Sequence, residues 1–213
     1  MKLALVGGAP TWIHAPYADR DWTIWAHASC QPLHLPRVDR WFDLHTVDVW
    51  RQGKTWYRPD ASEPLTYVDW LASRDVPITM QESYPLIPTA ERYPLRDIVE
   101  TFNIVPAEWD LSQKDAEWWE LVKDRGEFTC TVSYMIALAL YMGVECIDLF
   151  GIDFAGNDIL KIERTVQRPG AKYWVGIARG MGVPVTVAPG SRFEYQQFLY
   201  GYQRTPEPAL LTV

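Results

Sequence analysis

A helix that is apolar on nearly every side, followed at once by a short apolar strand, constrains this chain more than any other feature. Residues 130–154 read CTVSYMIALALYMGVECIDLFGIDF. Residues 131–142 have no polar face, which indicates a helix that its neighbours bury, and Gly143 is placed to end it. Residues 145–150 predict a buried strand. A buried helix that leads directly into a buried strand is typical of an α/β domain with a parallel sheet.

Short apolar strands recur along the chain and alternate with helical segments. We expect strands at residues 2–6, 22–26, 40–45, 76–80 and 183–187, and helices at residues 65–73, 95–102, 112–123, 167–180 and 192–200. Pro169 would then lie in the first turn of its helix. The alternation predicts an α/β domain with a mostly parallel sheet flanked by helices. We expect one domain over residues 1–213, in which the Pro- and Trp-rich residues 50–128 form an inserted lid or acceptor lobe.

Composition excludes several classes of protein. Apolar residues make up 48% of the chain, which is enough for a sizeable core. The formal net charge of -7 argues against a broad nucleic-acid-binding surface. The cysteines lack the spacing of a zinc site, so we expect reduced thiols and no metal site. Residues 1–6 predict a strand rather than a signal peptide, and no run of about 18 apolar residues occurs, so we expect a cytoplasmic protein without a membrane span.

The residues that follow the strands are candidate site residues, because parallel α/β sheets bind ligands at the carboxyl ends of their strands. Gly7, Gly8 and Ala9 follow the first strand and form either a tight turn or a loop whose N–H groups bind phosphate. Asp153 follows the strand at residues 145–150; it either fixes its loop or accepts hydrogen bonds from a ribose. His45 is either a structural histidine or a proton carrier.

Two predicted helix starts add further candidates. Thr131 opens the buried helix next to Thr129, Cys130 and Ser133, and this polar group either caps the helix or also presents its N-terminus to a phosphate. Arg168 opens the helix at residues 167–180 and is either a solvated side chain or a contact to a phosphate. Both alternatives stay open on the residues alone.

Residues 130–154 and the opening MKLALVGGAPT resemble segments of the bacterial sialyltransferases of glycosyltransferase family 42. They also resemble related Rossmann-like proteins of the DUF115 and MptE-like type. The likeness covers about a fifth of the chain. It implies a single-domain, Rossmann-like transferase that binds a nucleotide, with Gly7, Gly8 and Ala9 near the donor phosphate and with Gly151 and Asp153 near the nucleotide. Thr131 corresponds to the turn that opens the family's helix.

The chain departs from the family's pattern at three places. The family's helix-opening glycine is Val132, and its strand-end asparagines correspond to Ala28 and His45. The family's catalytic histidine follows Gly-Ile-Asp, whereas all four histidines here precede residue 46. These departures argue against a sialyltransferase in the strict sense, and they leave Asp153 and His45 as candidate catalytic bases. Residues 166–187 also resemble a segment of small proteins from tailed-phage genomes.

Three functions stay open. The first is a metal-independent glycosyltransferase that uses a nucleotide-sugar donor and no cofactor; a phage-encoded protein would work in the host cytoplasm, with a DNA base as one candidate acceptor. The second is a diphosphokinase-like phosphotransferase, which would need Mg²⁺ and a second carboxylate such as Asp158. The third is a non-catalytic protein that sequesters a nucleotide. Each is compatible with an oligomer.

Overall fold

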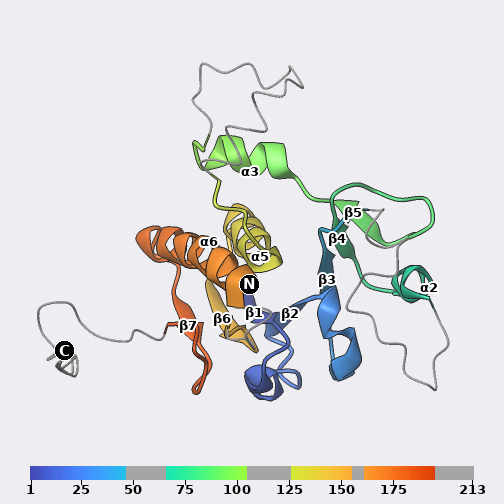
Figure 1. Ribbon diagram of the computed structural model, residues 1–213, viewed down its shortest axis with the longest axis horizontal. Coiled ribbons are helices and arrows are strands. Elements are labelled where there is room, and N and C mark those ends of the chain that lie inside the picture. The colour runs from blue at the N-terminus through green and yellow to red at the C-terminus, as the bar shows by residue number, and fades with distance from the viewer. Residues whose placement is uncertain (47–65, 105–125, 155–160, 195–213) are drawn as a thin grey trace, which may run out of the picture.

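The computed structural model describes residues 1–46, 66–104, 126–154 and 161–194. Its centre is a seven-stranded sheet in the order β5-β4-β3-β2-β1-β6-β7, and every pair of neighbours is parallel (Figure 1). The strands are β1 (Lys2–Val6), β2 (Trp22–His27), β3 (Arg40–Asp43), β4 (Ile78–Met80), β5 (Ala90–Arg92), β6 (Cys146–Phe150) and β7 (Val185–Val187). The predicted α/β fold with a parallel sheet is confirmed.

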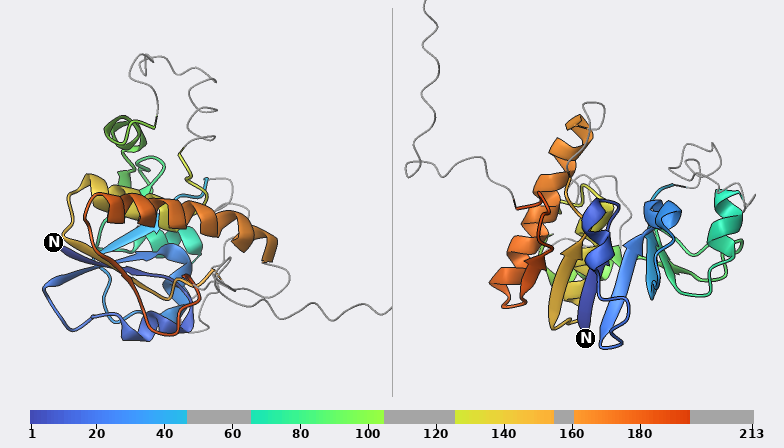
Figure 2. Two further views of the ribbon diagram at one scale, coloured as in Figure 1. Left: turned by 90° about the vertical axis from the view of Figure 1, so that its left-hand side faces the viewer. Right: turned by 90° about the horizontal axis from the view of Figure 1, so that it is seen from below.

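Helices cover both faces of the sheet. The described helices are α2 (Tyr67–Ala72), α3 (Leu95–Thr101), α5 (Thr131–Tyr141) and α6 (Lys161–Gly180), with the 3₁₀ helices η1 (Pro10–His14) and η2 (Ala28–Leu33). One core cluster contains buried residues of α3, α5 and α6, and a second contains buried residues of η2 and α2. Figure 2 (left) shows α5 and α6 on the first face.

The alternation of side chains along β1 explains why both faces need cover. Leu3 and Leu5 pack with α5 and α6 in the first cluster, whereas Ala4 and Val6 belong to the second. Successive strand residues point to opposite faces, so a strand that is apolar at every position must lie in the middle of the sheet. The apolar circumference of α5 has the same cause, because this helix packs against the sheet, α3 and α6.

The order of the strands reverses at β1, which lies between β2 and β6. Val6 is the register partner of Ala26 in β2 and of Phe150 in β6. The chain therefore leaves β1 and β6 in neighbouring positions at the same edge of the sheet. Such a switch point is where doubly wound sheets bind ligands, and the loops after β1 and β6 carry Gly7, Gly8 and Asp153.

Helix α6 begins at Lys161, six residues earlier than predicted. Pro169 therefore lies inside the helix and not in its first turn, so that prediction was wrong. The residues on either side of the proline pack closely on the segment that precedes α5. Thr129 Oγ1 donates to the carbonyl of Gln167 over 3.1 Å, and a Cβ on Gly170 would lie 2.2 Å from Thr129 Oγ1. The Arg-Pro-Gly sequence thus marks a tight helix contact rather than a helix start.

Residues 50–128 contribute to the sheet itself. Strands β4 and β5 extend the sheet beyond β3. Strand β5 is a short edge strand with mostly polar residues, so it lacks the apolar pattern by which the other strands were predicted. Residues 47–65 and 105–125, with the helix expected at 112–123, lie outside the described residues, as does most of the helix expected at 192–200. A lid or acceptor lobe in this segment stays a prediction.

Among the described helices, none combines the length and the apolar character that a membrane crossing requires.

Candidate functional site

The loops that follow β1 and β6 are joined to each other by hydrogen bonds. The N–H of Gly7 donates to the carbonyl of Phe150 over 2.8 Å, and the N–H of Ala9 donates to the carbonyl of Gly151 over 2.8 Å. In the reverse direction, the N–H of Gly151 donates to Thr11 Oγ1 over 2.8 Å. Three N–H groups expected near a phosphate therefore already have protein acceptors. The loops form a rigid wall at the switch point rather than an open cradle.

Gly8 differs from the other glycines of this wall. Gly7 is buried against Gly151, whereas Gly8 is exposed and a Cβ added to it would meet no atom within 4 Å. Among the described residues, no acceptor is found for its N–H. Of the loop predicted to bind nucleotide, Gly8 is therefore the position with space and a donor for a ligand.

Asp153 lies at the end of the same wall and has an unusual carboxylate. Its Oδ1 atom is buried and has no hydrogen-bond partner in the described part of the chain. The residues on either side are held in place: Ser191 Oγ donates to the carbonyl of Ile152 over 2.9 Å, and the ring of Phe154 packs 5.8 Å from that of Phe193. Buried carboxylate oxygens nearly always have a donor. A ligand hydroxyl or N–H would supply one.

The start of α5 lies beside α6. Its N-cap residue is Cys130, whose side chain makes no capping hydrogen bond, so the predicted capping by a small polar side chain was wrong. Thr129 Oγ1 and Cys130 Sγ instead donate to the carbonyl of Gln167, at 3.1 and 3.6 Å. Thr131 is the first residue of the helix and is half-buried. Within the described part of the chain, the side chain of the N-cap residue therefore does not cap the first turn of α5.

Arg168 lies inside α6 and not at its start. Its Nε donates to the carbonyl of Phe193 over 3.0 Å, and its Nη2 donates to the carbonyls of Phe193 and Arg192 over 2.7 and 2.9 Å. These bonds fix the segment that follows β7 against α6. Arg168 therefore has a structural role at the carboxyl edge of the sheet, and a phosphate contact by this residue stays a prediction.

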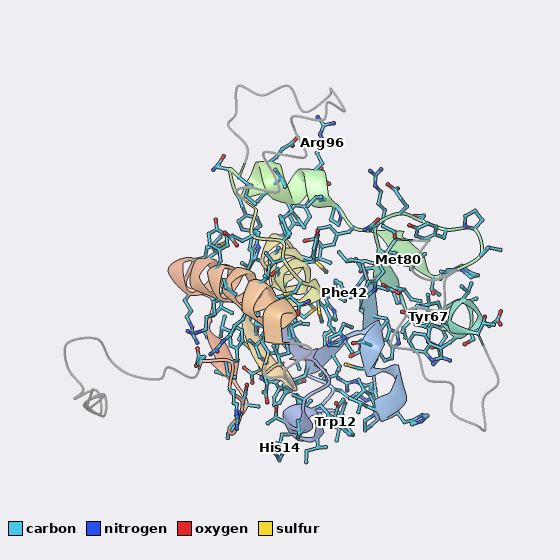
Figure 3. The ribbon with its side chains drawn as sticks, viewed as in Figure 1. Trp12, His14, Phe42, Tyr67, Met80 and Arg96 are labelled. Carbon is cyan, nitrogen blue, oxygen red and sulfur yellow. The ribbon has the colours of Figure 1, made fainter. Side chains whose placement is uncertain are left out.

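A second group of polar residues follows β3. Asp43 ends the strand with its side chain fully buried, and its Oδ1 accepts from the N–H of His45 over 3.0 Å and lies 2.7 Å from His45 Nδ1. The hydroxyl of Tyr67 donates to Oδ2 from α2. Figure 3 shows Tyr67 between α2 and the sheet. Burial, followed by the neighbouring Asp43, raises the pKa of Tyr67 well above its usual value. These three residues are called the Asp43 cluster below.

A third group follows β2. Ser29 Oγ bonds His27 Nδ1, and Cys30 Sγ lies 3.6 Å from His27 Nε2 and donates to the carbonyl of Val6 over 3.6 Å. Cys30 is fully buried, and burial raises the pKa of its thiol far above the usual value. A thiol held neutral in the core is a poor nucleophile. This group is therefore part of the packing beneath the site.

The two residues predicted as catalytic bases lie at different places along this edge. Asp153 follows β6 and His45 follows β3, and both β1 and β2 lie between these strands. Neighbouring strands are about 4.8 Å apart, so three steps separate the two strand ends by roughly 14 Å. Asp153 and His45 therefore cannot act on the same atom, although one extended ligand could reach both.

The sequence patterns did not reveal Asp43 and Tyr67 as members of this cluster. Asp43 and His45 stand two residues apart where β3 ends, and this spacing could have pointed to their contact. Tyr67 reaches them from α2 (Tyr67–Ala72), and no local pattern reveals such a contact. Among the residues that the structure describes, no group of three or more His, Cys, Asp or Glu side chains is placed to hold a metal ion.

Solved structures of bacterial sialyltransferases share this fold. One is the sialyltransferase CstII from Campylobacter jejuni with the substrate analogue CMP-3FNeuAc; it matches with a TM-score of 0.51 and 14% identity over 89% of this chain and 81% of that chain. Another is a point variant of CST-II with CMP, at a TM-score of 0.53 and 12% identity over 90% of this chain and 83% of that one. No family description matches the sequence. No curated protein matches it either. At these identities the likeness shows the Rossmann-like fold.

Proposed function

We propose that this protein is a nucleotide-binding transferase, a glycosyltransferase that takes a nucleotide-sugar donor without a metal ion. The observation that carries the proposal is the buried Oδ1 of Asp153, which has no partner among the described residues and stands at the switch point of the sheet. A ribose hydroxyl would donate a hydrogen bond to this oxygen. Acidic side chains in doubly wound nucleotide-binding folds accept hydrogen bonds from ribose hydroxyls in this way. The shared fold with enzymes that bind CMP and CMP-3FNeuAc adds support.

The remaining parts of the site fit a nucleotide phosphate. Gly8 offers an exposed N–H in open space, and the first turn of α5 at Thr131 offers N–H groups that the side chain of its N-cap residue does not cap. Donors of this kind stabilise the negative charge that develops on a leaving phosphate. In this proposal Gly7, Ala9 and Gly151 shape the wall behind the ligand, and Arg168 holds the segment after β7 beside it.

Isothermal titration with a panel of nucleotides and nucleotide-sugars tests the proposal. The panel comprises CMP, UDP, GDP and ADP with their sugar conjugates, each titrated in EDTA and again in Mg²⁺. We expect a nucleotide-sugar to bind in EDTA and Asp153→Asn to weaken that binding by about tenfold, the equivalent of 1.4 kcal/mol. Asp97→Asn, an exposed carboxylate on α3, is the matched control. Absence of binding across the panel would refute the proposal.

The two other functions give different outcomes in the same titration. A phosphotransferase would bind only with Mg²⁺; its second carboxylate, Asp158, lies outside the described residues. A sequestering protein would bind a nucleotide without releasing product from any conjugate. The phage origin and the DNA-base acceptor stay predictions. Native mass spectrometry of the protein purified from its host would identify a retained nucleotide, and the identity of that ligand would choose among the three functions.

A further inference from the structure

The Asp43 cluster is built like a device that orients a histidine for proton transfer. The carboxylate of Asp43 is fully buried, whereas the side chain of His45 is 46% exposed. Both carboxylate oxygens have donors: Oδ1 accepts from the N–H of His45, and Oδ2 accepts from the hydroxyl of Tyr67. A buried carboxylate with this support can hold a neighbouring imidazole in one orientation.

The contact with Asp43 favours one tautomer of His45. Asp43 Oδ1 already accepts from a backbone N–H, and it lies 2.7 Å from His45 Nδ1. Because a carboxylate oxygen in this position accepts, Nδ1 carries a proton and donates. In the neutral ring, Nε2 is then the basic nitrogen. The backbone beneath the ring is held as well, because Gln81 Nε2 donates to the carbonyl of Leu44 over 2.7 Å.

The position of the cluster suits the acceptor side of the proposed reaction. His45 follows β3, roughly 14 Å along the carboxyl edge from Asp153 by the spacing of strands. A nucleotide-sugar whose ribose contacts Asp153 would bring its sugar towards His45 if it extended along this edge in the direction of β3. The half-exposed imidazole stands where a second substrate can approach from solvent.

We propose that His45 is the general base of the transfer and that Asp43 and Tyr67 are its positioning residues. This inference rests on the proposed function. The oxygen of an acceptor hydroxyl forms a bond to the anomeric carbon of the donor sugar, and the bond from that carbon to the phosphate oxygen breaks. Its electron pair leaves with the nucleotide, and the hydroxyl proton goes to His45 Nε2. Asp43 stabilises the imidazolium that forms.

The kinetic test measures how fast the protein releases nucleotide from a nucleotide-sugar when water is the acceptor. The donor is the nucleotide-sugar that binds in the isothermal titration described above. We expect His45→Ala to slow release by roughly 100-fold or more and Asp43→Asn by roughly 10–100-fold, each with the donor Kd within twofold of wild type. Added imidazole should restore part of the activity of His45→Ala, which a purely structural role would not allow. Asp97→Asn and Tyr141→Phe, both exposed and outside the cluster, are controls.

Nitrogen-15 NMR of the histidine rings tests the positioning independently of activity. We expect wild-type His45 to be protonated at Nδ1 when neutral, and Asp43→Asn and Tyr67→Phe to populate the other tautomer. Tyr67→Phe keeps the ring that packs in the second core cluster, so it serves if Asp43→Asn does not fold.

Failure of this inference can be told from failure of the proposed function. If donor binds and His45→Ala releases nucleotide at the wild-type rate, or His45 carries its proton on Nε2, the inference is wrong and the proposed function stands. If the wild type binds a donor but releases no nucleotide with water or with a panel of hydroxyl acceptors, the protein catalyses no transfer. That outcome refutes both the inference about His45 and the transferase, and it supports the sequestering protein. If no donor binds the wild type, both are wrong.

Discussion

Gly7 and Gly151 approach each other so closely at the switch point that neither can carry a side chain. A Cβ on Gly7 would lie 2.4 Å from the carbonyl oxygen of Gly151, and a Cβ on Gly151 would lie 2.2 Å from that of Gly7. Gly151 also has φ +64°, a conformation that side chains disfavour. The two glycines join the loops after β1 and β6 and thereby set the position of Asp153. Their close approach shapes the wall at the switch point.

Alanine substitutions at Gly7, Gly8 and Gly151 should distinguish effects on stability from effects on nucleotide binding. We expect Gly7→Ala and Gly151→Ala to lower the free energy of unfolding by about 2–4 kcal/mol, because backbone must move to admit the new Cβ. Gly8→Ala should leave stability within about 0.5 kcal/mol, since its Cβ enters open space, yet weaken nucleotide binding. Urea unfolding measures the first effect and titration the second. A Gly151→Ala protein as stable as Gly8→Ala would contradict the close approach.

Two glycines of α6 provide an internally matched pair. A Cβ on Gly170 would lie 2.2 Å from Thr129 Oγ1 and 2.5 Å from the carbonyl of Glu127, whereas a Cβ on Gly176 would meet nothing within 4 Å. We expect Gly176→Ala to stabilise the protein by about 1 kcal/mol through helix propensity and Gly170→Ala to destabilise it by about 2 kcal/mol or more. Thermal unfolding of both variants checks the prediction. Equal shifts would show that α6 does not pack on this segment.

The parallel sheet was predictable because its central strands are apolar at every position. Residues 2–6 could be buried on both faces only inside a layered α/β fold, and Gly143, with φ +69°, ends α5 where the pattern indicated. The start of α6 was not predictable, because Pro169 is normally read as a helix boundary. The close approach of Gly170, next to this proline, to Thr129 joins residues 41 positions apart.

The positions of the candidate residues along the sheet edge were predictable, and their contacts were less so. The strand ends were found, since ligand sites follow parallel strands, and Asp153 was singled out as a carboxylate after an apolar strand. The glycines near it suggested a phosphate cradle, but the hydrogen bonds of Gly7 and Ala9 serve the wall instead. Tyr67 could not be found, because its contact to Asp43 depends on how α2 packs on the sheet.

We expect Asp153 to lower the free energy of unfolding of the ligand-free protein. Its buried Oδ1 has no donor in the described part of the chain, a situation that costs about 1–3 kcal/mol. We expect Asp153→Asn to raise the free energy of unfolding by about 1 kcal/mol while nucleotide affinity falls. The control is Asp148→Asn on β6, whose carboxylate accepts from Thr186 and should not affect nucleotide binding. An Asp153→Asn protein that is both less stable and equally tight in binding would contradict this.

The three cysteines should differ in reactivity. Cys30 is fully buried and burial raises the pKa of its thiol, whereas Cys130 and Cys146 are partly exposed. We expect two thiols per chain to react with a disulfide reagent in the native protein near pH 8, and the third only after denaturation. Cys30→Ala should keep two reactive thiols under native conditions. Fast reaction of all three in the wild type would show that the core beneath His27 opens.

Two buried tyrosines should make the protein sensitive to alkali. Burial raises the pKa of Tyr67 and of Tyr93 well above the usual value of 10.0, and the hydroxyl of Tyr93 donates to the carbonyl of Tyr134 over 3.0 Å. The fold holds both phenols neutral, so their contribution to stability is complete below pH 10 and is lost as the pH rises from there towards the folded-state pKa.

Each of these two tyrosines adds up to about 1.4 kcal/mol per pH unit to the fall in the free energy of unfolding. We therefore expect the free energy of unfolding to fall more slowly above pH 10 in Tyr93→Phe than in wild type, as measured by urea unfolding at pH 8, 10 and 11. Tyr141→Phe, with an exposed ring at the end of α5, should fall in parallel with wild type. Parallel curves for all three proteins would show that Tyr93 ionises in the folded state as easily as in the unfolded chain.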